Sequence, residues 1–200
     1  TINVAITAPI HMVYGHFGTQ IVEYLNKRYP FVRILEMRDS NADPNIFEGA
    51  TLRFLHQKCI TDDILVLYVH SKGLSNHGIQ AHTWRQVLNH YCIERWAECV
   101  KYLQDPLTDL VGVRDALARN NNVSGNIWWS KAKYIRTLPE PLDSTKYESD
   151  PIRWPGNEEY RYAFENWYWI NNPTVHHLVD TKTNHYVDAC YLEDLQRNKS

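Results

Sequence analysis

The feature that most constrains this 200-residue sequence is a short apolar run that ends abruptly in polar and flexible residues. Residues 64–69 read Ile-Leu-Val-Leu-Tyr-Val, and His70, Ser71, Lys72 and Gly73 follow directly. A continuous run of this kind is typical of a strand in a sheet that helices cover on both faces. In open α/β sheets the ligand crevice lies outside the carboxyl ends of the strands, so the four residues after the run are candidate ligand contacts.

These four residues have chemistry that suits a phosphate-bearing ligand. Lysine supplies a cation, histidine and serine supply hydrogen-bonding groups, and glycine lets backbone N–H groups approach a ligand closely. The alternative is an ordinary exit from a strand into a loop with a solvated lysine. The tetrapeptide by itself favours neither interpretation.

The rest of the chain alternates predicted strands and helices. Strands are expected over residues 2–8 and 31–37, and helices over 19–29 and 47–58. A long amphipathic helix is expected over 82–104, with one apolar stripe that must pack against the sheet: Trp84, Val87, Leu88, Tyr91, Cys92, Trp96, Cys99, Val100 and Leu103. Further elements are a strand over 109–113, an extended segment over 123–129, a short helix over 132–138, a helix over 157–169, a strand over 174–179 and a helix over 186–197. This succession predicts an α/β fold with a mostly parallel, Rossmann-like central sheet flanked by helices, in a single domain.

Composition and charge argue against several classes of protein. The formal net charge is −2 and no Lys/Arg block occurs, so no nucleic-acid interface is expected. No apolar run approaches the roughly 20 residues that span a bilayer, so no membrane insertion is expected. The four cysteines lack C-x-x-C spacing, which favours buried thiols in a reducing, cytoplasmic compartment over a zinc site. The chain starts at Thr1 rather than Met, which is compatible with a domain of a larger multidomain protein.

Common catalytic motifs are missing from the sequence. No pair of histidines has the i, i+4 spacing of a helical zinc site, and no Gly-rich phosphate loop or G-x-S-x-G elbow occurs. Zinc hydrolases, P-loop enzymes and α/β-hydrolases are therefore not indicated.

Several motifs occur in an order that resembles one protein family. They are Asn41-Ala42-Asp43 with Phe47-Glu48, Tyr68-Val69-His70-Ser71-Lys72-Gly73, Trp84-Arg85, Asp109-Leu110-Val111-Gly112, Ser124-Gly125-Asn126-Ile127-Trp128-Trp129, Tyr134-Ile135 with Leu138-Pro139, and Glu165-Asn166-Trp167. Over residues 2–169 this succession resembles GT-A-type glycosyltransferase domains related to the rhamnan-synthesis proteins of bacteria. Similar domains occur in multidomain enzymes of algae and large algal viruses.

The resemblance implies an activity and its partners. A GT-A-like sheet would bind a nucleotide-sugar, with UDP favoured as the nucleotide, and transfer a hexosyl or deoxyhexosyl group to a glycan acceptor. Polysaccharide or glycoprotein glycan synthesis is the implied process. The implied partners are the nucleotide-sugar donor, the glycan acceptor and other domains of a larger enzyme.

The sequence departs from better-known GT-A enzymes at the end of the central strand. Those enzymes usually carry Asp-x-Asp there, which holds a divalent Mn or Mg ion against the diphosphate, whereas this strand ends in Tyr68-Val69-His70. A fixed cation can also offset the charge that develops on the leaving nucleoside diphosphate. Lys72 is the candidate, helped by the N–H groups of residues 71–73, while His70 would be a phosphate hydrogen-bond donor or a single metal ligand. Dependence on a metal is therefore left open.

Further donor contacts follow from position in the predicted sheet. Thr7, Ala8 and Pro9 end the first strand and Asp39 ends the second, where this architecture holds the base and ribose. Asp43 lies just beyond and is either a donor contact or a structural cap.

The resemblance adds more residues to the donor site. They are Arg85, Ser124, Gly125, Asn126 and Trp128. The Ser-Gly-Asn segment resembles the small-residue segment that faces the donor sugar in GT-A enzymes, with glycine allowing close approach. Trp128 and Trp129 point to opposite sides of an extended chain, so at most one of them lines the pocket and the other is core.

An inverting sugar transfer needs a general base near the acceptor hydroxyl, normally a carboxylate. Glu165 matches the family's acidic position, and we assign it as the base. The alternative is an i, i+4 ion pair with Arg161 on a solvated helix face, worth only about 0.3 to 0.5 kcal/mol. Asp115, which follows the predicted strand over 109–113, is the second candidate, and a retaining mechanism is left open.

A competing interpretation is a non-catalytic glycan- or nucleotide-binding module of a larger enzyme. The chain has seven Trp and thirteen Tyr residues, whose rings suit stacking on sugars and bases, although large rings are more often core. Such a module needs no base and would explain the missing Asp-x-Asp pair. A nucleotidyltransferase is a third interpretation, but it normally needs metal-binding carboxylates at this strand end.

Overall fold

The structure is a computed structural model that describes residues 2–8, 20, 23–24, 27–28, 32–39, 48–69, 79–114, 123–141, 164 and 166–179. The chain divides into two compact units, Thr1–Lys58 with Pro139–Trp167, and Cys59–Leu138 with Tyr168–Ser200. The expected single domain over residues 1–200 stays a prediction. No helix in the described part of the chain is long and apolar enough to cross a membrane.

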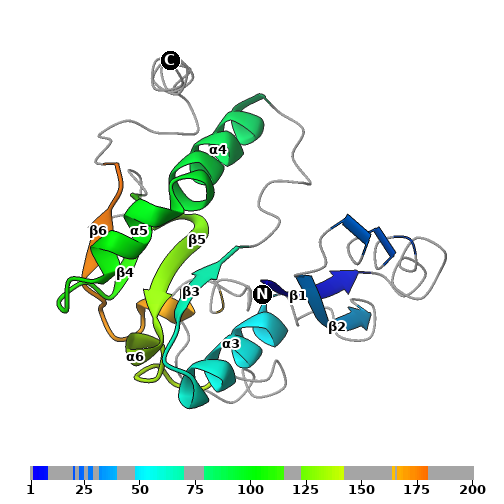
Figure 1. The fold of residues 1–200 in the computed structure, drawn as a ribbon, viewed down its shortest axis with the longest axis horizontal. Coiled ribbons are helices and arrows are strands. Elements are labelled where there is room, and N and C mark those ends of the chain that lie inside the picture. The colour runs from blue at the N-terminus through cyan, green and yellow to red at the C-terminus, as the bar shows by residue number, and fades with distance from the viewer. Residues whose placement is uncertain are drawn as a thin grey trace, which may run out of the picture. The chain divides into compact units, whose positions relative to one another are not determined.

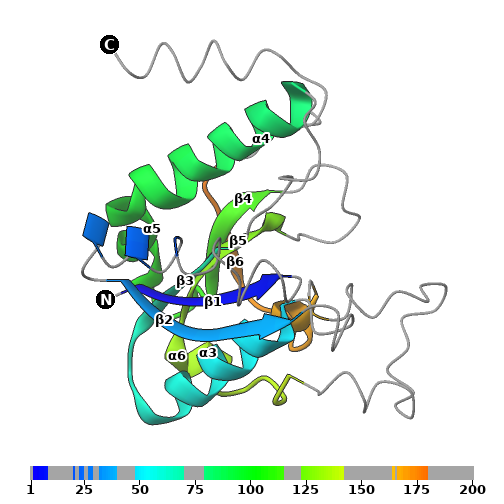
Figure 2. The same ribbon diagram turned by 90° about the vertical axis from the view of Figure 1, so that its right-hand side faces the viewer.

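The first unit contains a parallel pair of strands, β1 (Ile2–Ala8) and β2 (Val32–Asp39), which lie side by side in Figure 2. Both predicted strands are confirmed, and the second extends two residues beyond its expected end. Between them, residues 20, 23–24 and 27–28 are helical, in agreement with the helix expected over 19–29. A helical crossover of this length is what two parallel neighbouring strands require.

The first unit also contains most of helix α3 (Gly49–Thr61), which was expected over 47–58. Gly49 lies against the ring of Phe164, so close that an added Cβ would stand 2.7 Å from the ring carbons. The ring of His56 meets Trp167 edge-on, with 6.0 Å between centroids. The indole Nε1 of Trp167 donates a hydrogen bond of 2.8 Å to the carbonyl oxygen of Pro139. Aromatic side chains and the buried Leu52 of α3 therefore belong to the described core of this unit.

The second unit is built on a four-stranded sheet with the order β3-β5-β4-β6 (Figure 1). Its strands are β3 (Leu65–Tyr68), β4 (Leu110–Arg114), β5 (Val123–Lys131) and β6 (Val175–His177). β5 is antiparallel to both β3 and β4, whereas β6 is parallel to β4. The short helix α6 (Ala132–Ile135) follows β5, and the 3-10 turn η3 (Trp167–Trp169) precedes β6.

These pairings correct the expectation of a mostly parallel central sheet. Two of the three pairings in the four-stranded sheet are antiparallel, so this sheet is mixed. Only residues 115–122 separate β4 from β5, and parallel neighbours need a crossover of a dozen or more residues. A connection this short lets the chain return only antiparallel. The α/β class itself, with helices flanking the sheet, is as expected.

The long helix expected over residues 82–104 is interrupted. It consists of α4 (Ile79–Asn89), a π-helical turn η1 (His90–Glu94) and α5 (Trp96–Leu103). Arg95 between the last two has a non-helical backbone with φ −94° and ψ 31°, which breaks the regular phase of the apolar stripe. Trp96 was expected to pack on the sheet but is 56% exposed, and we correct that expectation.

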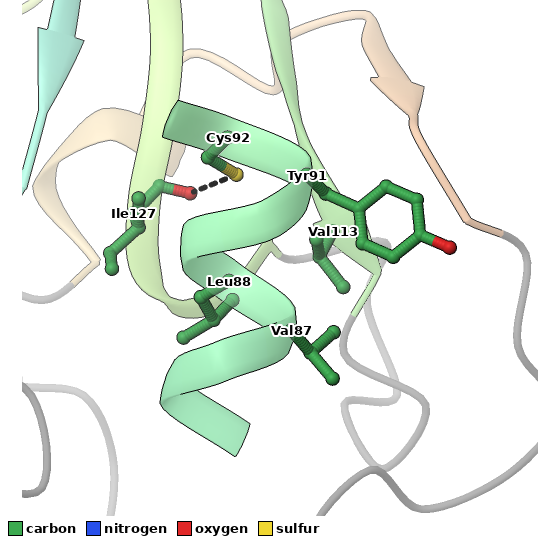
Figure 3. Packing of buried hydrophobic residues seen from close by; sticks show 6 residues of the cluster. All are labelled: Val87, Leu88, Tyr91, Cys92, Val113 and Ile127. Carbon is green, nitrogen blue, oxygen red and sulfur yellow. Dashed lines mark hydrogen bonds between the residues drawn. The ribbon is translucent and has the colours of Figure 1, made fainter. Parts of the chain in front are cut away.

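α4, η1 and α5 pack on one face of the sheet, as Figures 1 and 2 show. Figure 3 shows the centre of this packing, where residues of α4 and η1 meet Val113 of β4 and Ile127 of β5. The Cys92 thiol donates to the Ile127 carbonyl at 3.9 Å. The other buried members are Val87, Leu88 and Tyr91.

Aromatic rings cover the opposite face of the sheet. Tyr68 of β3 and Trp128 of β5 are register partners and stack with 5.1 Å between ring centroids. Tyr168 adds a third ring, 5.4 Å from Trp128, and its carbonyl accepts a 2.7 Å hydrogen bond from the hydroxyl of Tyr134. The apolar run predicted a strand buried on both faces, and this is wrong for β3: Val66 and Tyr68 are buried, but Leu65 is 41% exposed, and β3 is an outer strand of the sheet.

Candidate functional site

The strand directions bring several predicted site segments to one edge of the sheet. Because β3 and β4 are both antiparallel to β5, their carboxyl ends lie at the same edge as the beginning of β5. The chain leaves β3 at Tyr68 shortly before His70, and it leaves β4 at Arg114 immediately before Asp115. It enters β5 at Val123, directly before the Ser-Gly-Asn segment. This edge of the sheet is the candidate functional site.

The Ser-Gly-Asn segment forms a bulge in β5 at this edge. The register runs from Gly112 opposite Trp128 to Arg114 opposite Val123, so two steps on β4 face five steps on β5. The extra length is taken up by two consecutive residues in the left-handed region, Gly125 with φ 67° and Asn126 with φ 52°. Bulges of this kind are common next to active sites, where they re-aim the chain. We call residues 124–127 the β5 bulge.

The β5 bulge is held by close contacts from α4 and β4. A Cβ on Gly125 would stand 2.4 Å from Leu88 Cδ1 and 3.2 Å from Trp84 Cζ2. A Cβ on Gly112 would stand 2.7 Å from Val123 Cγ1. Side chains of α4 therefore approach Gly125 closely, whereas the expected approach of a donor sugar to this glycine stays a prediction.

Trp84, Leu88 and Gly112 were not among the predicted site residues. A glycine inside an otherwise apolar strand is a known signal of a bulge or of close backbone approach, and Gly112 carried that signal. The two α4 residues were expected as members of the apolar stripe, and Trp84 also belongs to the Trp84-Arg85 motif of the family resemblance.

Trp128 is placed in the core beneath the β5 bulge. Its side chain is 0% exposed, and its indole Nε1 donates a hydrogen bond of 2.9 Å to Asn126 Oδ1. This placement gives no support to the assignment of Trp128 as a contact of the nucleotide-sugar. Asn126 is also buried, and its carboxamide oxygen is directed toward the core.

Trp129 lies on the opposite face of β5. Its indole Nε1 donates to the carbonyl oxygen of Cys92 at 2.7 Å, and its ring packs with the helix-side core. The prediction that the two tryptophans point to opposite sides is therefore confirmed. Ser124 lies in the strand at the edge, and half-buried Arg85 follows Trp84 on α4.

The predicted base and ribose contacts belong to the first unit. Thr7 and Ala8 are the last two residues of β1, and the parallel pairing puts Ala8 opposite Asp39 of β2. The two strand ends that were expected to share a ligand are thus neighbours. The remaining predicted site residues lie outside the described residues: Pro9, Asp43, His70, Ser71, Lys72, Gly73, Asp115 and Glu165.

The cysteines of the described chain are buried free thiols. They are Cys59, Cys92 and Cys99. Burial raises the pKa of Cys92 to about 12 and the pKa values of the other two to about 11, so each is a neutral thiol near pH 7. Within residues 48–69, 79–114 and the other described ranges, no three His, Cys, Asp or Glu side chains are grouped to hold a metal ion.

One comparison with known proteins returned a match. A family model described as a domain of unknown function (DUF8361) matches residues 3–172, which include parts of both units and every predicted site residue. No curated protein and no solved structure matches the sequence.

Proposed function

This chain belongs to the DUF8361 family of domains of unknown function, and we propose that it is a GT-A-like glycosyltransferase domain. It would transfer a sugar from a nucleotide-sugar, with UDP favoured as the nucleotide, to a glycan acceptor. We propose that the transfer inverts the configuration at the anomeric carbon of the sugar and that a carboxylate acts as the base.

The observation that carries the proposal is the convergence at the candidate edge. Three segments with ligand-binding chemistry meet the sheet there: the end of β3 before residues 70–73, the end of β4 before Asp115, and the β5 bulge. Ligands of open α/β sheets bind outside the carboxyl ends of the strands. The segments are far apart in sequence, so their meeting at one edge supports a binding site rather than three unrelated loop exits.

Each role in the transfer has a candidate side chain. Lys72 would offset the negative charge that develops on the leaving nucleoside diphosphate. Glu165, or Asp115 in its place, would accept the proton of the attacking acceptor hydroxyl. His70 is a potential metal ligand after β3, but the sequence has no Asp-x-Asp there, so no step of the proposal depends on a metal.

Thermal unfolding with a panel of nucleotides tests the donor site. The panel is UDP, GDP, CMP and dTDP, each with manganese and each with EDTA. A ligand that binds only the folded state at about 100 times its Kd adds roughly 2.7 kcal/mol, which is a readily measured shift. We expect UDP to stabilise the protein in both series, and a Lys72→Ala variant to lose that shift. Lys133→Ala is the matched control, because Lys133 is exposed on α6.

The outcomes separate the proposal from its competitor. A shift with manganese that EDTA abolishes would replace the lysine-based assignment with a metal-based one. No shift with any nucleotide would contradict a donor site and leave a glycan-binding module as the better interpretation. Slow hydrolysis of the UDP-sugar without acceptor would favour the transferase, since a binding module has no reason to cleave that bond.

A further inference from the structure

We propose that Trp128 is a positioning residue for donor-sugar binding: through Asn126 it holds the β5 bulge in the shape that receives the sugar. The inference rests on the proposed function. It changes the role that the sequence suggested for Trp128, from a contact of the ligand to a buried support of the contact.

The first observation is how completely the Trp128 side chain is held. It is 0% exposed and packs against the rings of Tyr68 and Tyr168, with centroids 5.1 Å and 5.4 Å away. Its one polar group is the indole N–H, which donates to Asn126 Oδ1 at 2.9 Å. A fully buried ring in contact with two other rings leaves this N–H little freedom, so its hydrogen bond restrains Asn126.

The second observation is the backbone of Asn126. Its φ of 52° lies in the left-handed region, which few non-glycine residues adopt and which asparagine tolerates better than most. Such a conformation persists only where the surroundings determine it, and it clusters at ligand sites. The hydrogen bond from Trp128 is a determinant that the structure shows directly.

The third observation is that the β5 bulge is also confined from the helix side. Leu88 and Trp84 occupy the space where a Cβ on Gly125 would stand. Ile127, which ends the bulge, packs into the same helix-side core. The bulge is therefore held between α4 on one face and Trp128 on the other, and neither neighbour leaves it room to relax.

The position of the β5 bulge connects this support to the ligand. The bulge lies at the edge where β3 and β4 end, which is the edge proposed to bind the donor. Because Trp128 holds Asn126 through Oδ1, the contacts that the backbone of this segment makes to a sugar would depend on that hydrogen bond. A change that loosens the shape should weaken sugar binding more than nucleotide binding.

The test is a Trp128→Phe variant, which keeps an aromatic ring in the stack but removes the N–H donor. Trp167→Phe is the matched control, because Trp167 is a buried tryptophan whose Nε1 donates to a carbonyl oxygen in the first unit. Affinities for UDP, UDP-glucose and UDP-galactose are measured by calorimetry for wild type and both variants. We expect Trp128→Phe to weaken binding of the UDP-sugar at least 10-fold and that of UDP less than 2-fold. The control should leave the ratio of the two affinities unchanged.

A second variant keeps the proposal testable if Trp128→Phe does not fold. Asn126→Gly can still adopt φ 52°, but it has no carboxamide for Trp128 to hold. The same selective loss of UDP-sugar affinity is expected. Equal losses for UDP and UDP-sugar, or the same loss in Trp167→Phe, would overturn the positioning role. Failure of wild type to bind any of the three ligands would instead overturn the proposed function, and the positioning role with it.

Discussion

The indole Nε1 of Trp129 donates a hydrogen bond of 2.7 Å to the carbonyl oxygen of Cys92, which ties the central strand β5 to the π-helical turn η1. A π-helical turn displaces backbone groups from the regular i, i+4 pairing of an α-helix. An indole N–H from the sheet gives one of these carbonyl groups a partner. The contact links residues 37 positions apart and helps fix where the helices cross the sheet.

Removal of this contact should destabilise the protein. A Trp129→Phe variant leaves a largely buried carbonyl group short of its partner, which typically costs about 1 to 3 kcal/mol of unfolding free energy. Urea denaturation measures the change. Trp96→Phe is the control, because Trp96 is mostly exposed and should change stability by no more than about 0.5 kcal/mol. Equal effects of the two substitutions would show that the Trp129 hydrogen bond contributes nothing specific.

The β5 bulge should not tolerate a side chain at Gly125. Gly125→Ala combines a left-handed backbone, unfavourable by about 1 to 2 kcal/mol for other residues, with a methyl group 2.4 Å from Leu88 Cδ1. We expect a loss of at least about 2 kcal/mol in denaturant unfolding.

A double-mutant cycle separates these two costs. Leu88→Ala makes room for the new methyl group. The loss of unfolding free energy caused by Gly125→Ala should therefore be smaller in the Leu88→Ala background than in wild type, by at least about 1 kcal/mol. Leu103→Ala also truncates a buried leucine, but on α5 and away from the bulge, so it should be additive with Gly125→Ala. Additivity in both cycles would contradict a steric conflict between Leu88 and a side chain at position 125.

Stability should fall at alkaline pH because of the buried thiols. Burial raises the pKa of Cys92 from about 9 to about 12, so the unfolded chain loses this proton at lower pH than the folded chain does. The stabilising contribution is therefore complete below pH 9 and is lost as pH rises toward 12. The free energy of unfolding should decrease by up to about 1.4 kcal/mol per pH unit from this one thiol. Urea unfolding at pH 8, 9 and 10 should give a shallower decline for Cys92→Ala, whereas parallel profiles would exclude the contribution.

The proposed base can be tested without a structure of the acceptor complex. Glu165→Gln removes the proton acceptor but keeps the size of the side chain, so sugar transfer should fall at least about 100-fold while UDP affinity stays unchanged. Glu140→Gln, at an exposed glutamate, is the control and should transfer normally. If Asp115→Asn gives the loss instead, the base is Asp115. Normal transfer by both variants would remove each carboxylate from the mechanism.

Local sequence patterns determined the kinds of element in this chain and much of its burial. The apolar run at 64–69 forms a strand, and Trp128 and Trp129 alternate across β5, because side-chain direction in a strand has a period of two. Cys92 and Cys99 are buried, as their shared helical face predicted. These features depend on neighbouring residues, so the sequence alone sufficed to predict them.

Only the tertiary structure decided how these elements pair and where the polar groups of the site point. The pairing of β3 with β5 and of β6 with β4, and the left-handed bulge at Gly125 and Asn126 packed against α4, involve contacts between distant segments. No local pattern shows that the Trp128 ring is fully buried, because the rings that pack against it come from residues 68 and 168. The physical reason is that pairing energies and packing space are set by residues far away in the chain, whereas propensity acts over a few neighbours.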